Sequence, residues 1–598
     1  MDYYGFYTGQ EFEAYQFLGA HTTRNDGVIF RTFAPNAKKI SVIGDFNAWQ
    51  ETYMEKIYDG NFWECRIKDA KPGMRYKYRI TSKTGKILDH CDPYGFASEK
   101  RPGTASIIST LDSYAFQDEK WEKSRGSTLE KPMNIYELHF GSWRRKSENT
   151  DDWYTYRELA DLLLPYLKEH SYNYVELLPL SEHPCDASWG YQSTGFFCPT
   201  SRYGTPDDLR YFIDRCHQAQ IGVIMDFVPV HFAVDDYGLW NYDGTALYEY
   251  PHTDVGRSEW GSCNFMHSRG EVCSFLQSSA FYWLKEFHFD GLRMDAVSNL
   301  IYWQGDQNRG ENRAAIQFLQ TMNAGLKARL PSAILIAEDS SVFTGVTKKV
   351  ESGGLGFDYK WDLGWMNDTL SYFQTPSKQR PQEYHKLTFS MMYFRNERYL
   401  LPLSHDEVVH GKATILQKMS GDYEQKFPQA KALYLYMMAH PGKKLNFMGN
   451  EIGQLREWDE NREQDWNLLQ YPKHDAFLHF ISDLNKLYLK SPALYKDDYL
   501  DSGFQWLDCH QETRCIYAFE RCGLRQRLVF LFNFSGEVQK NYVLNVAHCR
   551  ALRPLLHTEW EKYGGTEKEI MEKTACDENG ATFTLAPFSG ICFAEMHY

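Results

Sequence analysis

The sequence predicts a three-part chain in which a central (β/α)₈ barrel, the TIM-barrel fold, lies between two β-sandwiches. Three observations carry this prediction. Short β-rich runs broken by turns fill residues 17–111, apolar runs alternate with helical periodicities from residue 133 onward, and short alternating runs return after residue 500. Because a regular alternation of strands and helices indicates parallel strand pairing, eight such strands fit a closed barrel.

The N-terminal part is expected to be a small β-sandwich. Its strands are predicted in runs rich in β-branched and aromatic residues that end in turn signals. These runs are residues 28–33, 40–43, 62–67 and 76–81. The polar stretch 117–131 is expected to link this part to the next one. The first domain is therefore placed at residues 1–116.

The central part supplies eight candidate strands and six candidate helices. The strands are expected at residues 134–140, 174–180, 221–228, 289–297, 333–338, 354–358, 399–403 and 444–447. The helices are expected at residues 156–170, 205–220, 278–288, 314–330, 425–439 and 476–490. Thr205 and Pro206 mark one helix start, because a capping hydroxyl precedes a proline at the first helical position. The barrel domain is placed at residues 117–498.

The C-terminal part is expected to be a second β-sandwich at residues 499–598. Short alternating runs at residues 515–519, 528–534 and 582–585 predict its strands.

Composition excludes several classes of protein. The net charge of −14 disfavours nucleic acid and anionic membranes as partners, and no apolar run approaches the roughly 20 residues of a membrane-spanning helix. The N-terminus lacks the basic start and apolar stretch of a signal peptide, so a cytoplasmic protein is expected. The 13 cysteines include no C-x-x-C pair, which predicts reduced thiols without a zinc or redox site.

Charged and polar side chains follow the ends of several predicted strands. Because active sites of (β/α)₈ barrels lie at the carboxyl ends of the strands, this placement indicates a catalytic site. The residues concerned are Asp226, His231, Arg293, Asp295, Glu338, His405 and Asp406.

Two of these carboxylates fit the chemistry of glycoside cleavage. Arg293 and Asp295 project from the same side of a strand, and an adjacent arginine is expected to hold the aspartate ionised, as a nucleophile requires. Glu338 follows an apolar run, and a dry surrounding would favour its protonated form, as a proton donor requires. A retaining glycosidase needs such carboxyl groups about 5–5.5 Å apart.

Other readings of the same residues were weighed. A single aspartate at a strand end is more often a helix cap or a loop ion pair, but four such positions in one barrel favour a shared site. His405, Asp406, Glu407 and His410 could be metal ligands, yet their spacing is not H-E-x-x-H, and no calcium loop is recognisable. The chain is therefore expected to need no metal and no cofactor.

Several segments resemble a known family. Residues 226–231 (DFVPVH), 291–296 (GLRMDA), 337–340 (AEDS) and 403–407 (LSHDE) resemble, in order, the four short motifs of the α-amylase superfamily. Residues 44–49 (GDFNAW) are similar to its glycogen-associated carbohydrate-binding module. Within the superfamily, residues 189–192 (WGYQ), 406–412 (DEVVHGK) and 448–454 (MGNEIGQ) are similar to the branching enzymes.

The resemblance implies a set of roles. Asp295 would be the nucleophile, Glu338 the general acid and base, and Asp406 the carboxylate that stabilises the transition state. The side chains that would contact the sugar at the cleavage point are Tyr191, Asp226, His231, Arg293 and His405. Met294 and Phe227 depart from the residues usual in the family, without touching a catalytic carboxylate.

The implied activity is that of a branching transferase, which cleaves α-1,4 bonds and transfers the oligoglucan to a 6-hydroxyl with retention of configuration. Its partner would be an α-glucan polymer such as glycogen or amylose, and a monomer is expected. The alternatives are an α-amylase-like or debranching hydrolase of the same superfamily and a non-catalytic glucan-binding scaffold.

Overall fold

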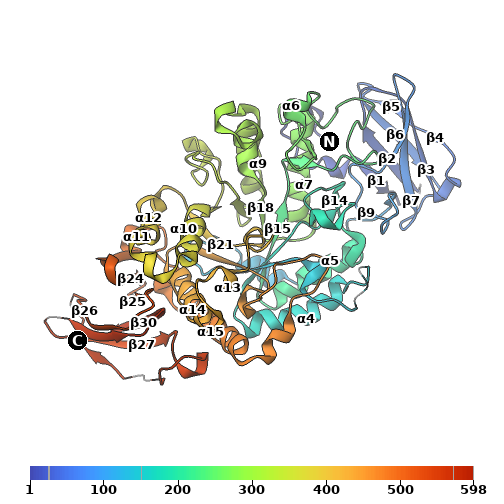
Figure 1. Ribbon diagram of the computed structural model, residues 1–598. Coiled ribbons are helices and arrows are strands. Elements are labelled where there is room, and N and C mark those ends of the chain that lie inside the picture. The colour runs from blue at the N-terminus through green and yellow to red at the C-terminus, as the bar shows by residue number, and fades with distance from the viewer. Residues whose placement is uncertain are drawn as a thin grey trace.

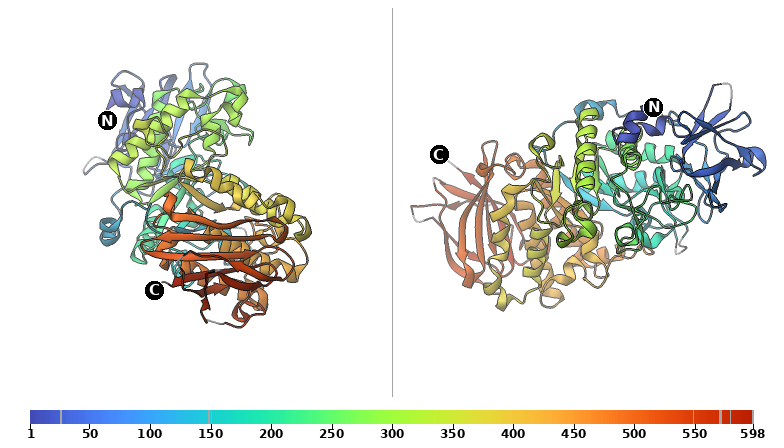
Figure 2. Two further views of the ribbon diagram at one scale, coloured as in Figure 1. Left: turned by 90° about the vertical axis from the view of Figure 1, so that its left-hand side faces the viewer. Right: turned by 90° about the horizontal axis from the view of Figure 1, so that it is seen from above.

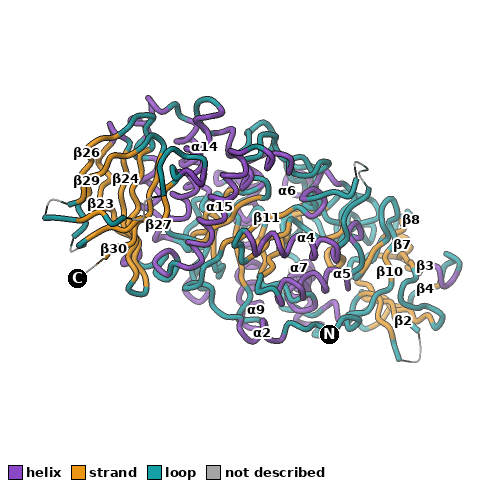
Figure 3. Tube along the Cα trace, turned by 90° about the horizontal axis from the view of Figure 1, so that it is seen from below, coloured by secondary structure: helices purple, strands orange, loops and turns teal. Residues whose placement is uncertain are grey.

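The computed structural model describes residues 1–24, 27–147, 149, 151–547, 549–569, 572–578 and 580–596. Two β-sandwiches lie at opposite ends of a central barrel domain (Figures 1 and 2). Seen from below, strands gather at both ends of the molecule, and helices surround the strands between them (Figure 3). Positions 597 and 598 of the predicted third domain lie outside the described residues.

Eight parallel strands close the central barrel, which confirms the predicted fold class. Each strand pairs with its neighbour in sequence, and the last pairs with the first. The strands are β11 (Asn134–Leu138), β12 (Tyr174–Leu177), β15 (Gly222–Phe227), β18 (Gly291–Met294), β19 (Ile334–Ala337), β20 (Tyr359–Trp361), β21 (Tyr399–Leu403) and β22 (Lys443–Phe447).

Helices follow the strands where periodicity predicted them. They are α4 (Tyr156–Glu169), α5 (Pro206–Gln218), α7 (Gly270–Glu286), α9 (Arg313–Arg329), α14 (Tyr423–Ala439) and α15 (Pro472–Lys490). The predicted start of α5 is confirmed: Thr205 Oγ1 accepts a hydrogen bond from the backbone N–H of Asp208, whose carboxylate accepts the N–H of Thr205 in return. This reciprocal pair satisfies two amides that a helix start leaves without partners.

The sixth barrel strand was predicted in the wrong place. The structure begins β20 at Tyr359, immediately after the predicted run 354–358. Gly353 and Gly356 have φ values of 82° and 81°, a left-handed backbone that forms a turn and not a strand. The helices α10 (Leu363–Gln374) and α12 (Lys386–Tyr393), which follow β20, were not predicted.

The N-terminal sandwich has two antiparallel sheets. One runs in the order β1 (Gly19–Thr22), β2 (Val28–Phe33), β6 (Phe62–Ile67), β5 (Glu55–Ile57). The other runs β4 (Thr52–Tyr53), β3 (Ala37–Gly44), β7 (Arg75–Ser82), β10 (Ser106–Ile107), β9 (Ala97–Ser98), with β8 (Ile87–His90) paired to β7. Ahead of the sandwich, α1 (Tyr3–Thr8) packs against α7 of the barrel, where Gln277 donates a hydrogen bond to the carbonyl of Gly9.

The predicted linker 117–131 is not a free connection. It contains α2 (Glu119–Ser124), and its Asp118 is buried beneath the barrel. Asp118 lies 2.7 Å from Nδ1 of His217 on α5 and 2.9 Å from Nδ1 of His288, so the segment anchors two barrel elements. Most of its other polar residues are exposed, so the composition that indicated a linker is that of a solvated segment with a buried anchor at Asp118.

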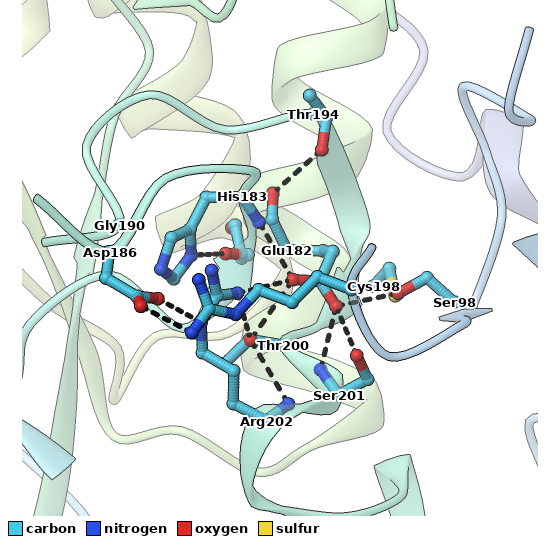
Figure 4. A network of polar contacts seen from close by, with 12 residues as sticks. Ser98, Glu182, His183, Asp186, Gly190, Thr194, Cys198, Thr200, Ser201 and Arg202 are labelled. Atoms are coloured by element: carbon cyan, nitrogen blue, oxygen red, sulfur yellow. Dashed lines mark hydrogen bonds and ion pairs between the residues drawn. The ribbon is translucent and has the colours of Figure 1, made fainter. Parts of the chain in front are cut away.

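A polar network joins the N-terminal sandwich to the barrel (Figure 4). Glu182 of the barrel hairpin β13–β14 (Ser181–Glu182 and Gly195–Pro199) accepts a hydrogen bond of 2.7 Å from Ser98 Oγ on β9. Arg202 Nη1 donates to the same glutamate at 2.8 Å, and its Nε donates to Asp186 at 2.8 Å. Arg101, which follows β9, pairs with Asp186 at 2.6 Å.

The C-terminal sandwich packs on helix α14 of the barrel. Its main sheet runs β23 (Phe504–Gln511), β24 (Ile516–Gly523), β25 (Gln526–Asn533), β30 (Ser589–Met596), β27 (Ala551–His557), β28 (Thr574–Ala575), and β26 (Gln539–Leu544) pairs with β29 (Ala581–Leu585). Arg521 of β24 and Lys443 of β22 both pair with the buried carboxylate of Asp498, at 2.7 and 3.4 Å. Within the described residues, no helix combines the length and apolar character that crossing a membrane requires.

Candidate active site

The interior of the barrel changes from apolar to charged along its strands. Ile135, Ile224 and Ile336 belong to a buried apolar cluster within the barrel. Because side chains two residues apart on a strand share a face, Glu137 follows Ile135 into the interior, and Asp226 follows Ile224. A layer of ionisable groups therefore lies above the apolar layer, at the carboxyl ends of the strands where barrel enzymes carry their active sites.

Arg293 on β18 connects three carboxylates. Its Nη1 lies 2.7 Å from Asp226 Oδ2 and 3.2 Å from Asp295 Oδ1, and its Nη2 lies 2.8 Å from Glu338 Oε2. The guanidinium is fully buried, and its carbon lies 4.2 Å from the ring centroid of Trp361. A planar group with several fixed donors is suited to such multiple pairing, which an ammonium group would not reproduce.

Asp295 and Glu338 follow the adjacent strands β18 and β19, so one guanidinium holds both carboxylates at the same end of the barrel. The Asp295 side chain is 14% exposed and that of Glu338 is 20% exposed, whereas Asp226 and Arg293 are fully covered. Asp295 and Glu338 are therefore the most accessible of these four side chains. The structure thus brings together the two residues on which the predicted chemistry depends.

The backbone turn after Asp295 contributes to the site. Ala296 has a φ of 45°, an unusual value for a residue with a side chain. In this conformation its backbone N–H donates a hydrogen bond of 3.0 Å to Glu338 Oε2, the oxygen that Arg293 also contacts. Within the described residues, both donors thus engage one oxygen of Glu338 and leave Oε1 to face a substrate.

The protonation of Asp295 differs from the sequence expectation. Burial, and next the carboxylate of Glu338, raise the pKa of Asp295 well above its ordinary range, although Arg293 acts in the opposite direction. Arg293 favours the ionised form, as predicted, but burial and Glu338 outweigh its effect, and Arg293 also has to serve Asp226 and Glu338. Two interacting carboxylates retain protons to higher pH than a single one.

Tyr191 lies between Asp226 and His405. Its hydroxyl donates a hydrogen bond of 2.5 Å to Asp226 Oδ2 and lies 3.3 Å from Nε2 of His405. The Tyr191 ring also stacks on the imidazole, with centroids 5.7 Å apart. Burial raises the pKa of Asp226 to about 6, while Arg293 acts to lower it.

His405 is held as a cation by two carboxylates. Its Nδ1 lies 2.6 Å from Oε1 of Glu137, whose Oε2 accepts the His405 backbone N–H at 2.9 Å. Burial acts to lower the pKa of His405, but Asp406 and Glu137 together raise it to about 9. Asp406 is 43% exposed and lies 3.5 Å from Nε2 of the imidazole, whose charge, with that of Arg293, holds the pKa of Asp406 below its usual range against the effect of burial.

His231 lies apart from this network. It belongs to the short strand β16 (His231–Phe232), and its ring lies 5.2 Å from that of Trp260, which is 46% exposed. Its Nδ1 has no hydrogen-bond partner among the described residues. Burial lowers the pKa of His231 to about 4, so the ring is neutral at pH 7 and one nitrogen can donate to a sugar hydroxyl.

Two buried residues of the site were missed by the sequence analysis. Glu137 and Glu176 stand next to each other on β11 and β12, and both are fully buried. The strand period could have identified them, because each lies two residues after an apolar residue of the interior or its edge, Ile135 and Tyr174. They were overlooked because only residues at the ends of apolar runs were considered.

Two groups of side chains lie close enough together to be considered as metal ligands. One consists of Asp118, Glu122 and His217 beneath the barrel, and the other of Glu137, Glu176 and Asp226 inside it. Basic side chains already face both groups: His217 and His288 face Asp118, and His405 and Arg293 face the interior group. That the chain needs no metal or cofactor stays a prediction.

Three family profiles match this chain. They are the carbohydrate-binding module 48 (isoamylase N-terminal domain) at residues 17–95, the alpha amylase catalytic domain at residues 149–240, and the alpha amylase C-terminal all-beta domain at residues 506–594. Their order agrees with the order of the three parts of the structure.

Solved structures share the fold. The chain superposes on a pullulanase from Bacillus acidopullulyticus with a TM-score of 0.74 and 16% identity, covering 96% of this chain and 74% of the other. A pullulanase complexed with maltotetraose from Anoxybacillus sp. LM18-11 gives a TM-score of 0.75 at 15% identity, covering 97% and 87%. At such identity the likeness shows the architecture alone.

Curated relatives are much more similar in sequence. A 1,4-alpha-glucan branching enzyme of Fusobacterium nucleatum is 45% identical over 573 residues, covering 95% of this chain and 93% of that protein. The 1,4-alpha-glucan branching enzyme of Bacillus subtilis is 42% identical over 605 residues, covering 98% and 96%. With such identity along nearly its whole length, and with the barrel and flanking β-domains described above, this chain belongs to the 1,4-alpha-glucan branching enzymes of the α-amylase family.

Proposed function

We propose that the chain is a glycogen branching enzyme that cleaves α-1,4-glucosidic bonds and transfers the released oligoglucan to a 6-hydroxyl, forming an α-1,6 branch. The observation that carries this proposal is the pairing of Asp295 and Glu338 through one buried guanidinium, with both carboxylates reachable from outside. Such a pair flanking one bond is the machinery of glycoside cleavage. Family membership selects transfer to a 6-hydroxyl as its outcome.

In the first step, Glu338 gives its proton to the oxygen of the scissile bond, and the carboxylate of Asp295 attacks the anomeric carbon. The bond between that carbon and the leaving oxygen breaks, and the donor chain remains attached to Asp295 as a glycosyl ester. Arg293 favours the negative charge on Asp295, and the N–H of Ala296 orients the carboxyl group of Glu338.

In the second step, Glu338 takes the proton of an acceptor 6-hydroxyl, whose oxygen attacks the same carbon and displaces Asp295. Two inversions give net retention of the anomeric configuration. Asp406 stabilises the positive charge that develops on the sugar, and Nε2 of His405 lies 3.5 Å from the Asp406 carboxylate. Tyr191, Asp226, His231, Arg293 and His405 are the proposed contacts to the sugar at the cleavage point.

Transfer exceeds hydrolysis only if the acceptor glucan is oriented better than water at the glycosyl ester. The exposed ring of Trp260 beside His231 offers an apolar face where a sugar ring can pack. The same machinery without acceptor capture would give an amylase-like hydrolase.

The test uses linear amylose and the purified chain. Branching lowers the iodine stain without a matching rise in reducing ends, and linkage analysis of the product then shows new α-1,6 bonds. Asp295→Asn serves as the inactive control. Reducing ends that rise in proportion to the loss of stain, without α-1,6 linkages, would show a hydrolase and contradict the proposal.

A further inference from the structure

Three carboxylates, one of them the proposed sugar contact Asp226, meet inside the barrel. Glu137, Glu176 and Asp226 each contribute an oxygen that lies within 4.8 Å of the others, and all three side chains are fully buried. Three ionised carboxylates at this separation would repel one another strongly in a dry interior. Their charges must therefore be compensated or removed.

Two of the three are compensated by cations. Glu137 receives two hydrogen bonds from His405, one from the ring and one from the backbone. Oδ2 of Asp226 receives hydrogen bonds from Arg293 and Tyr191. By contrast, Oδ1 of Asp226 and both carboxyl oxygens of Glu176 have no donor among the described residues.

A proton on Glu176 resolves this arrangement. Two carboxylates that face each other without a donor are each left with unsatisfied acceptors, whereas a protonated acid supplies one hydrogen bond to its neighbour and removes one charge. Asp226 is already the better stabilised anion, because Arg293 contacts it directly at 2.7 Å. The proton is thus expected on Glu176.

We infer that Glu176 is a positioning residue that stays neutral and donates a hydrogen bond to Oδ1 of Asp226, which keeps Asp226 aimed at Arg293 and Tyr191. Burial, followed by the carboxylates of Asp226 and Glu137, raises the pKa of Glu176 well above its usual range, with only Arg293 acting against it. These three groups come from the strands β15, β11 and β18 around it. The link to catalysis rests on the proposed function.

The consequence is a requirement for a neutral donor at position 176 and not for a charge. Glu176→Gln keeps a donor of nearly the same shape and is expected to keep kcat within about threefold of the parent. Glu176→Leu removes the donor, releases Asp226 to move, and is expected to lower kcat by about 10- to 100-fold, since a displacement of about 1 Å in a site can cost a hundredfold. KM for amylose is expected to change less than kcat, because the sugar contacts concerned act at the cleavage point.

An infrared measurement tests the protonation without reference to activity. At pH 8, the difference spectrum between the parent and Glu176→Gln is expected to show one carbonyl band of a protonated carboxyl group that shifts in D₂O. Its absence would overturn the inference whatever the enzyme does. Thermal unfolding of both variants separates loss of fold from loss of position.

The kinetic outcomes are equally decisive. Equal losses of kcat in folded Glu176→Gln and Glu176→Leu would overturn the inference, because they would mean that a charge is required. If the parent hydrolyses amylose and forms no branches, the proposed function fails, yet the infrared band and the ranking of the two variants still test the role of Glu176.

Discussion

Two aspartates flank the same barrel strand, and their surroundings are opposite. Asp290 precedes β18 and is met by Arg125, His217, the indole N–H of Trp121 and the backbone N–H of Val223, at 2.7–3.0 Å. Asp295 follows the strand and is met by one shared guanidinium at 3.2 Å, with a second carboxylate nearby.

The pKa values of the two aspartates are shifted in opposite directions. Burial alone would raise the pKa of Asp290, but His217 and Arg125 lower it below its ordinary range. Burial and Glu338 raise the pKa of Asp295. Four residues thus separate a carboxylate that stabilises the fold from one whose charge is only partly compensated, and a partly compensated carboxylate is available to react.

The largest expected contrast comes from replacing each aspartate by asparagine. Asp295→Asn removes the proposed nucleophile and is expected to lower kcat by about 10⁴-fold or more, with a free energy of unfolding equal to or above that of the parent. Asp290→Asn removes a buried anion from beside His217 and Arg125, which keep only Asp118 and Glu122 as partners, and is expected to lower the free energy of unfolding by about 3–5 kcal/mol.

Branching assays and urea unfolding followed by tryptophan fluorescence check this pair. A folded Asp290→Asn protein is expected to retain its kcat within about threefold, in contrast to Asp295→Asn. Comparable losses of stability in both variants would contradict the inference that Asp290 stabilises the fold and Asp295 does not.

The two arginines can be compared in the same way. Arg293→Lys offers one ammonium where three carboxylates need a planar fork, and kcat is expected to fall by about 10²- to 10³-fold. Arg125→Lys at the opposite end is expected to change kcat by less than about threefold and to reduce stability by about 1 kcal/mol. A Lys at position 293 that supports near-parental turnover would show that Asp226, Asp295 and Glu338 do not depend on a shared partner.

Asp295 and Asp290 are expected to become protonated at different pH values. As pH falls, Asp295 takes up a proton at a pKa above the ordinary value of about 3.9, and the proposed nucleophile loses its charge. The stability that Asp290 contributes is present above that ordinary value and is lost only as pH falls through its lower folded-state pKa. Reversible inactivation of a folded protein is therefore expected at mildly acidic pH.

The measurement is kcat/KM against pH, together with thermal unfolding at each pH. Recovery of activity on return to pH 7 is the control for intact protein. Simultaneous loss of activity and fold would contradict the opposite directions of the two pKa shifts.

The smallest expected effect concerns the hairpin β13–β14, whose connecting loop contains Tyr191. Ser98 of the N-terminal sandwich holds Glu182 there (Figure 4), and Arg101 pairs with Asp186. The double variant Ser98→Ala, Arg101→Ala is expected to raise KM for amylose about threefold with kcat nearly unchanged, because each contact is partly exposed and contributes about 1 kcal/mol. Lys123→Ala, a surface change in α2, is the control, and equal KM values would show that the hairpin holds its shape alone.

Sequence patterns were sufficient for the barrel, and they located polar residues that the structure brings together. Asp226 and Arg293 near the ends of β15 and β18, and Glu338 and His405 beyond the ends of β19 and β21, could be recognised because a parallel strand stops where its apolar run stops. The strand at β20 was misplaced because glycines at 353 and 356 interrupt a pattern that continues in Tyr359–Trp361. The three predicted domain boundaries stay predictions.

The charges of the site could not be predicted in the same way. Asp295 was assigned an ionised state from one sequence neighbour, but its protonation depends on Glu338, which lies 43 positions later and arrives only when β18 and β19 pair. Glu137 and Glu176 escaped notice for the same reason, because their importance comes from neighbours across the barrel.

The unusual turn at Ala296 lets a backbone amide orient Glu338, the proposed general acid. The amide that orients Glu338 points inward because this residue accepts a φ of 45°. Ala296→Gly would therefore keep the backbone N–H donor, whereas valine or isoleucine at this position would force the peptide away from the carboxyl group of Glu338. The constraint on residue 296 concerns shape alone, although it lies beside the most reactive atoms of the molecule.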